Sequence, residues 1–167
     1  MDKKKVEQHP FPPLFDKDSR LLILGSFPSV KSKEMNFFYG HPQNRFWKVI
    51  ASIYDDPIPD SIEEKKRLIL ENHLALWDVI AECEIVGSSD ASIKNARAND
   101  LSEILKNAPI QKIIVNGKTA EKLYIKYIEP VTGIKAVALP STSPANAAWS
   151  LNRLVDVWKA DLLGTEL

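Results

Sequence analysis

The 167-residue sequence contains little cysteine and histidine, and this scarcity excludes several kinds of site. Its single cysteine, Cys83, cannot form an internal disulfide, and a cysteine-based zinc or iron–sulfur centre needs about four ligands. The three histidines, His9, His41 and His73, lie far apart and lack the paired spacing of metal ligands. We therefore expect a protein that uses neither a metal nor a cofactor.

An excess of charge of either sign is also missing. Twenty-two basic and twenty-two acidic residues give a formal net charge of zero, which argues against strong, salt-driven binding to nucleic acid but allows a local basic surface. No apolar run approaches the ~20 residues of a membrane span, and the charged N-terminus does not resemble a signal peptide. We expect a cytoplasmic protein, associated with the nucleoid in a prokaryote, that contacts no membrane.

Several motifs of common enzyme classes are absent. Gly117-Lys118-Thr119 matches only the end of a phosphate-binding P-loop, because Lys112 occupies the position of the first glycine. The turn after the first predicted strand has no G-x-G-x-x-G, and no serine lies in G-x-S-x-G. The sequence thus argues against an NTPase, a dinucleotide-dependent enzyme and a serine hydrolase.

Short apolar runs that alternate with helical segments predict the fold. The predicted strands are 21–24, 73–77, 112–115 and 135–139, and helices are expected over 45–54, 62–72, 100–106, 119–128 and from Ser143-Pro144 onward. This alternation predicts a three-layer α/β/α sandwich on a four-stranded parallel sheet. We expect one domain over residues 21–167, preceded by an extended, proline-rich arm over residues 1–20. Residues 84–99, and the segment after Ser29 that carries Tyr39, are expected to be loops.

Four polar turns follow the four predicted strands, and parallel strands end at one edge of a sheet. These turns are 25–29, from residue 78 onward, 116–119 and 141–146. They are rich in small hydroxyls and amides, which bind phosphate oxygens and read base edges, and they adjoin aromatic residues on which a base can stack. Such a set suits a nucleotide that has been flipped out of a DNA duplex.

Three segments at these turns resemble a known family. GSFPS, FYGHPQNRFWKVI and STSPANA are similar, in order and spacing, to motifs of the uracil-DNA glycosylase superfamily. The middle segment resembles the mismatch-specific uracil/thymine-DNA glycosylases, and the other two, with Asn116-Gly117-Lys118, resemble the hypoxanthine-DNA glycosylase branch. The resemblance spans residues 21–157. It implies a monomeric, monofunctional DNA glycosylase that removes a deaminated base, foremost hypoxanthine, in base excision repair.

The resemblance also implies roles for individual residues. Asn44, which also fits the N-cap of the following helix, matches the asparagine thought to position the attacking water in the hypoxanthine branch, and Asn116 matches a second functional asparagine. The implied base pocket consists of Ser26, Phe27, Tyr39 and Ser141. The implied contacts to DNA phosphates and to the gap in the duplex are Ser29, His41, Ser143, Ala145 and Asn146.

Departures from the family pattern leave alternatives open. Ser26 and Phe27 stand where the family usually has a carboxylate or amide that positions water, and neither can activate water. A non-catalytic module that binds damaged DNA therefore remains an alternative, as does a glycosylase for mispaired uracil or thymine. A third alternative is a sandwich protein that binds free nucleotides.

Overall fold

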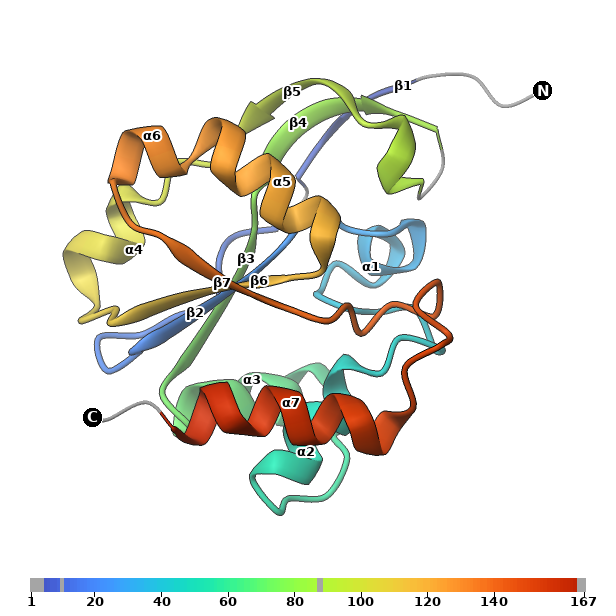
Figure 1. Cartoon of the computed structure of the whole chain (residues 1–167), viewed down its shortest axis with the longest axis vertical. Helices are drawn as coiled ribbons and strands as arrows, with labels where there is room; N and C mark the ends of the chain where they lie inside the picture. The colour runs from blue at the N-terminus through green and yellow to red at the C-terminus, as the bar shows by residue number, and fades with distance from the viewer. Residues whose placement is uncertain (1–4, 10, 87–88, 165–167) are drawn as a thin grey trace.

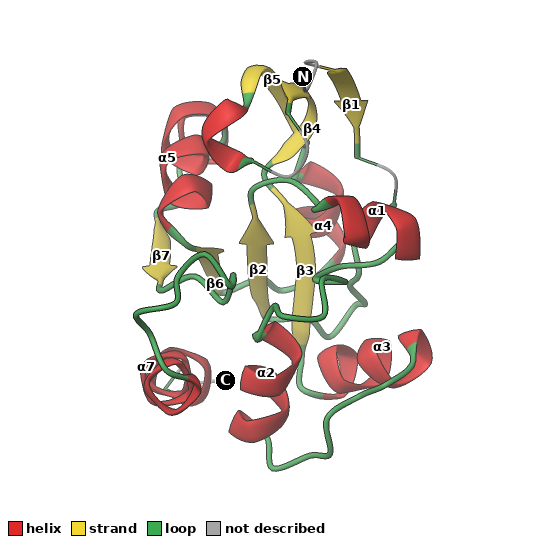
Figure 2. Ribbon diagram, turned by 90° about the vertical axis from the view of Figure 1, so that its right-hand side faces the viewer, coloured by secondary structure: helices red, strands yellow, loops and turns green. Residues whose placement is uncertain are grey.

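The centre of the molecule is a parallel sheet in the strand order β3-β2-β6-β7 (Figure 2). Its strands are β2 (Leu21–Gly25), β3 (Leu74–Asp78), β6 (Lys112–Asn116) and β7 (Ala136–Leu139). Each lies within one residue of its predicted position. Leu21 of β2 lies opposite both Leu74 and Lys112, so the strands are in register and their carboxyl ends share one edge.

Helices cover both faces of this sheet (Figure 1). One face carries α2 (Phe46–Ile53), α3 (Ile62–Glu71) and α7 (Leu151–Leu163), and the other carries α4 (Ser102–Asn107), α5 (Lys118–Tyr127) and α6 (Glu129–Thr132). The predicted three-layer sandwich is thereby confirmed. The computed structural model describes residues 5–9, 11–86 and 89–164, so the ends of the predicted arm and domain lie outside the described residues. No helix within these ranges has the length and apolarity needed to cross a bilayer.

The central strand β2 contributes to two separate apolar cores. Leu21 and Ile23 pack toward α2, α3 and α7, whereas Leu22 and Leu24 pack toward α4 and α5. All four side chains are at most 3% exposed. A strand that is buried on both faces has a continuous apolar sequence, and this is why the strand could be predicted from the sequence.

A second, antiparallel sheet was not predicted. It consists of β1 (Lys5–Gln8), β4 (Ile80–Ile85) and β5 (Lys94–Ala98) in the order β1-β4-β5, with the short 3-10 helix η1 (Asp90–Ser92) before β5. The expectation of a loop over residues 84–99 was therefore wrong at both ends, and residues 87–88 lie outside the described residues. β5 has the polar sequence KNARA, and it is held by pairing with β4 and by the 3.5 Å ion pair of Arg97 with Glu82.

The N-terminal arm is built into the domain. β1 pairs with β4, the ring of Phe11 is buried in the core, and Leu14 forms an isolated bridge to Leu76 of β3. The arm thus carries His9 across the molecule to the edge of the parallel sheet.

Three helices differ from expectation, and one of them, α6, was not predicted at all. α1 (Val30–Met35) occupies part of the expected loop, and it begins at the N-cap Ser29 and ends at Asn36 in a left-handed conformation. The last helix begins at Leu151 with Ser150 as its N-cap, so the expected start at Ser143-Pro144 was wrong. The Ser143 hydroxyl accepts the N–H of Ala145 two residues on, which closes a local turn instead of starting a helix.

Candidate active site

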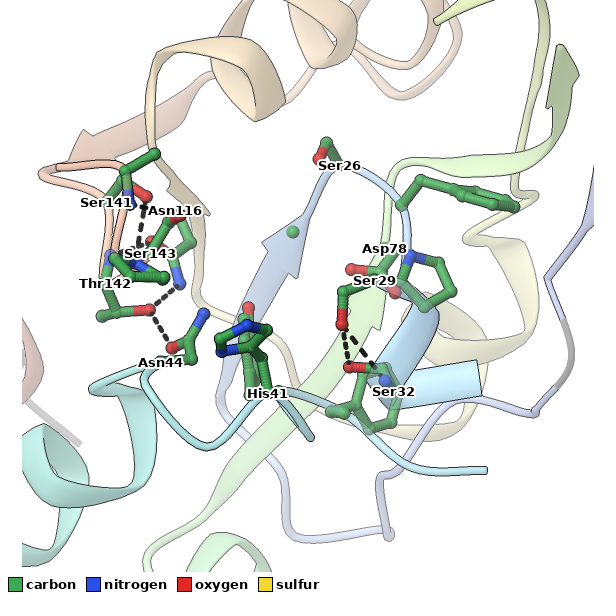
Figure 3. Close-up of a pocket in the computed structure, with 17 residues that line it drawn as sticks. Ser26, Ser29, Ser32, His41, Asn44, Asp78, Asn116, Ser141, Thr142 and Ser143 are labelled. Atoms are coloured by element: carbon green, nitrogen blue, oxygen red, sulfur yellow. Dashed lines mark hydrogen bonds between the residues drawn. The ribbon is translucent and has the colours of Figure 1, made fainter. Parts of the chain in front are cut away.

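A pocket of about 290 Å³ opens at the carboxyl edge of the parallel sheet (Figure 3). It lies near the lower end of the range for ligand sites, ~300–1,000 Å³, and so suits a single small ring system. The predicted site residues that line it are Ser26, Phe27, Ser29, Tyr39, His41, Asn44, Asn116, Ser141, Ser143 and Ala145. Asn146 does not line this pocket. It borders an adjoining hollow, and its amide nitrogen donates to the carbonyl of Ser141.

Gly25, at the end of β2, allows two polar side chains to approach the floor of the pocket. A Cβ at this position would lie 2.4 Å from Oδ1 of Asp78 and 3.3 Å from the hydroxyl of Tyr39. The first distance is far inside van der Waals contact. The absence of a side chain at Gly25 is therefore required for this arrangement.

A chain of hydrogen bonds connects the two predicted catalytic asparagines through Thr142. Nδ2 of Asn116 donates to Oγ1 of Thr142 (3.0 Å), and this hydroxyl donates to Oδ1 of Asn44 (2.8 Å; Figure 3). The backbone N–H of Thr142 donates to Oδ1 of Asn116 (3.1 Å), and that of Phe46 donates to Oδ1 of Asn44 (2.9 Å). The predicted capping oxygen is thus present, although the N-cap residue itself is Arg45.

These contacts determine the orientation of both amides. A backbone N–H can only donate, so the atom that faces it on Asn44 and on Asn116 must be oxygen. The Thr142 hydroxyl, which receives an N–H from Asn116, must then donate to Asn44. Both lone pairs of the Asn44 oxygen are used, and its NH₂ group remains as the part that can bind a ligand.

Tyr39 is held between the aromatic core and the polar floor. Its backbone has a left-handed φ of 52°, and its ring stacks on Phe46 with centroids 4.0 Å apart. Its buried hydroxyl makes no hydrogen bond of ordinary geometry to any described residue. Burial, and secondarily the charge of Asp78, raise the pKa of Tyr39 far above its ordinary value, while the nearby Asn116 amide lowers it only in part. The hydroxyl therefore keeps its proton and can donate.

Hydrogen bonds between hydroxyls hold the loop that carries Tyr39. Ser29 donates to the buried Ser32 hydroxyl (3.0 Å), which also accepts the N–H of Gly40 (2.9 Å). Nδ1 of His41 accepts the N–H of Gln43 (3.1 Å), so a neutral His41 carries its proton on Nε2. These contacts fix the loop in front of the sheet edge.

Arg45 connects α2 to the loop at residues 141–150. Its guanidinium donates to the carbonyls of Ser143 (3.2 Å), Asn146 (3.0 Å) and Trp149, and its backbone N–H donates to the carbonyl of Thr142 (3.0 Å). The side chain is thus a clamp inside the protein and not a free surface charge.

Sequence reasoning missed three contributors to the site. Thr142 is fully buried at the centre of the amide network, and Asp78 lines the pocket from the end of β3. His9 lies behind Asp78, with its Nε2 2.7 Å from Oδ2 of that carboxylate. The place of Asp78 after an apolar strand was a usable signal, whereas nothing in the local sequence links His9 to the site.

Comparisons with known proteins agree with this geometry. Residues 12–162 match the family described as the uracil DNA glycosylase superfamily. A Methanosarcina acetivorans protein named hypoxanthine DNA glycosylase is 34% identical over 155 residues, which cover 90% of this chain and 94% of that protein. A Methanosarcina barkeri protein of the same name is 33% identical over 147 residues, covering 84% of this chain and 89% of the other.

A solved structure resembles the whole fold. It is a solution NMR structure of a candidate uracil DNA glycosylase from Methanosarcina acetivorans, with a TM-score of 0.79 and 31% identity. The match covers 95% of this chain and 97% of that one. Because the family match spans nearly the whole described chain and includes every element around the pocket, the protein belongs to the uracil DNA glycosylase superfamily.

Proposed function

We propose that this protein is a monofunctional DNA glycosylase that hydrolyses the N-glycosidic bond of hypoxanthine flipped out of DNA. The observation that carries the proposal is the pocket at the sheet edge, which the three motif segments line together. The choice of hypoxanthine is supported by two relatives, each named hypoxanthine DNA glycosylase and each at least 33% identical.

The pocket offers the groups that this reaction needs. Breaking the glycosidic bond places positive charge on the sugar and negative charge on the departing base. Fixed N–H and O–H dipoles stabilise the base without having to reorganise, and the DNA phosphates stabilise the sugar. None of the described residues that line the pocket is a lysine, whose amine would be needed to form a Schiff base with the sugar.

Asn44 acts in this proposal through its NH₂ group. Figure 3 shows its amide nitrogen directed away from Thr142, and its oxygen is already engaged twice. A water molecule can accept a hydrogen bond from this N–H with one lone pair and attack the sugar with the other. Asn44 thus orients the water but cannot remove its proton. Asn116 keeps Asn44 in position through Thr142.

The remaining residues are proposed to contact the DNA. Ser29, His41 and Ser143 lie at the pocket and are proposed to bind phosphates, as small hydroxyls and ring N–H groups do. Ala145 is exposed on the loop held by Arg45 and is proposed to face the gap left by the flipped nucleotide. The Asn146 amide already binds Ser141, so Asn146 is proposed to support that loop from behind.

The test is alkali-revealed strand cleavage of oligonucleotides that carry one hypoxanthine or one uracil, in single and double strands. Asn44→Ala removes the amide that would orient the water. We expect release of hypoxanthine by the wild type and a loss of about 100-fold in Asn44→Ala. Asn152→Ala, an exposed asparagine on α7, is the matched control.

The outcomes separate the alternatives. Full release of hypoxanthine by folded Asn44→Ala would show that Asn44 does not position the attacking water. Release of uracil alone would place the enzyme with the mismatch-specific branch. Binding of hypoxanthine DNA by folded wild-type protein without any abasic product would identify a non-catalytic module and overturn the proposed activity.

A further inference from the structure

The floor of the pocket contains a carboxylate that the proposed chemistry does not use. Asp78 carries the one carboxylate among the described residues that line the pocket, and its side chain is only 7% exposed. Its Oδ2 is held by Nε2 of His9 at 2.7 Å, and Nδ1 of His9 lies 2.7 Å from the carbonyl of Phe11. The His9 side chain is only 4% exposed, so the pair is fixed on the side away from the pocket.

The role of Oδ1 of Asp78 follows from these contacts. A carbonyl cannot donate, so Nδ1 of His9 carries the proton that binds Phe11. Nε2 then either donates to an ionised Asp78 or accepts from a protonated one. In both cases a single proton lies between Nε2 and Oδ2, so Oδ1 carries no proton and remains a hydrogen-bond acceptor. The contact with His9 thus makes Oδ1 of Asp78, the oxygen next to Gly25, an acceptor and not a donor.

A donor lies beside this acceptor. Oδ1 of Asp78 and the hydroxyl of Tyr39 lie 2.4 Å and 3.3 Å from the same point, the place of an absent Cβ on Gly25. The Tyr39 hydroxyl keeps its proton. It meets the distance and angle of a hydrogen bond with none of the described residues, although the Asn116 amide lies near enough to lower its pKa in part. An unpaired buried hydroxyl is costly, and a ligand that supplies an acceptor removes this cost.

We propose that Asp78 and Tyr39 form an acceptor–donor pair that reads the lactam edge of the flipped base. The ring N–H of the base donates to Oδ1 of Asp78, and the adjacent carbonyl accepts from the hydroxyl of Tyr39. The inference rests on the proposed function and names its substrate class, which is bases with a ring N–H next to a carbonyl.

This pair distinguishes a deaminated base from its parent. Adenine presents a lone pair at N1 and an amino group at C6, so Asp78 faces an acceptor and Tyr39 faces a donor. Hypoxanthine reverses both, with N1–H and a C6 carbonyl. The Tyr39 hydroxyl can accept as well as donate, so Asp78 carries the discrimination. With adenine its buried oxygen faces the N1 lone pair and is left unpaired, and such a site rejects the wrong ligand strongly.

The test compares three oligonucleotides with the full-length protein. Rates of release are measured under single turnover for hypoxanthine and for 1-methylhypoxanthine, in which a methyl group replaces the N1 proton. Affinity is measured for a tetrahydrofuran abasic analogue, which has no base. Asp78→Ala and Tyr39→Phe are compared with the wild type, and Asp156→Ala, an exposed aspartate on α7, is the matched control.

We expect Asp78→Ala to release hypoxanthine on the order of 10- to 100-fold more slowly, the usual effect of leaving a buried donor without its hydrogen-bond partner. Its preference for hypoxanthine over 1-methylhypoxanthine should disappear, because the methyl group fits the space that the carboxylate leaves. Affinity for the tetrahydrofuran DNA should stay unchanged. Tyr39→Phe, which removes only an unpaired hydroxyl, should remain folded and lose hypoxanthine release with the same unchanged affinity.

His9 is tested as a positioning residue. His9→Leu should slow hypoxanthine release and weaken the preference over 1-methylhypoxanthine. His9→Gln, whose amide can donate to Asp78, should restore both.

Three results overturn the inference. The first is normal hypoxanthine release by both Asp78→Ala and Tyr39→Phe, and the second is a parallel loss of hypoxanthine release and tetrahydrofuran affinity. The third is wild-type protein that treats hypoxanthine and 1-methylhypoxanthine alike. A wild type that releases no hypoxanthine at all is a different result, because it rejects the proposed function from which the inference starts.

Discussion

At the scale of single residues, Gly25 shows how one missing side chain shapes the pocket. Gly25→Ala should destabilise the protein by about 1–3 kcal/mol, the usual cost of overpacking a core, because Asp78 is held by His9 and cannot move aside. Urea unfolding measures this change. In an Asp78→Ala background the same substitution should cost clearly less, because only the 3.3 Å approach to the Tyr39 hydroxyl remains. An undiminished cost there would show that the clash is not with Asp78.

The tyrosines predict a response to alkaline pH. Burial raises the pKa of Tyr54 to about 12, and that of Tyr39 is raised further. A tyrosine in the unfolded chain titrates near pH ~10, so the stabilisation is complete below that pH and is lost as the pH rises above it. The free energy of unfolding should therefore fall between about pH 10 and pH 12.

Tyr39→Phe and Tyr54→Phe should each reduce the loss of unfolding free energy above about pH 10. Urea unfolding at several pH values, with phenolate absorbance recorded in parallel, measures the effect. An identical pH dependence in wild type and both variants would contradict the assignment of the raised pKa values.

At the scale of elements, the Arg45 clamp joins α2 to the loop over residues 141–150. Arg45→Met keeps the stem of the side chain but leaves three carbonyls without their donor. We expect hydrogen exchange in this loop to become at least about 10-fold faster, because each lost bond to a charged group is worth ~1.5–3 kcal/mol. Hypoxanthine release should fall with it.

The control for this prediction is Arg153→Met. Arg153 lies over the Trp149 ring, 3.8 Å from its centroid, but donates to none of the three carbonyls. Loop exchange as fast in Arg153→Met as in Arg45→Met would show that Arg45 is not the clamp.

The same loop illustrates the limits of sequence reading. Buried strands such as Leu21–Gly25 were predictable because both of their faces are apolar, and the polar turns after them follow from parallel topology. The start of α7 was not predictable from Ser143-Pro144, because distant Arg45 holds this segment out of a helix. The strand β5 and the contact of His9 with the site were not predicted for a similar reason. Their positions depend on long-range partners and not on a local sequence pattern.

At the scale of the whole molecule, the balanced charge predicts weak salt dependence of DNA binding. Twenty-two basic and twenty-two acidic residues leave no net attraction to the phosphate backbone. The logarithm of affinity for hypoxanthine DNA should fall against the logarithm of salt concentration with a slope no steeper than about −3, as for a few phosphate contacts. Fluorescence anisotropy from low to moderate salt measures it, and a slope near −6 would reveal a basic surface that the composition conceals.

The strand order has a consequence for the time at which the enzyme matures. The central strand β2 lies between β3 and β6, both of which are synthesised long after it, and the pocket also needs Thr142 and Ala145 from the last part of the chain. Domains form during synthesis from the N-terminal end, yet this pocket needs residues 25–29 and residues 141–145 together. A nascent chain that lacks residues 141–145 therefore has an incomplete pocket, and the site forms only after that segment has been synthesised.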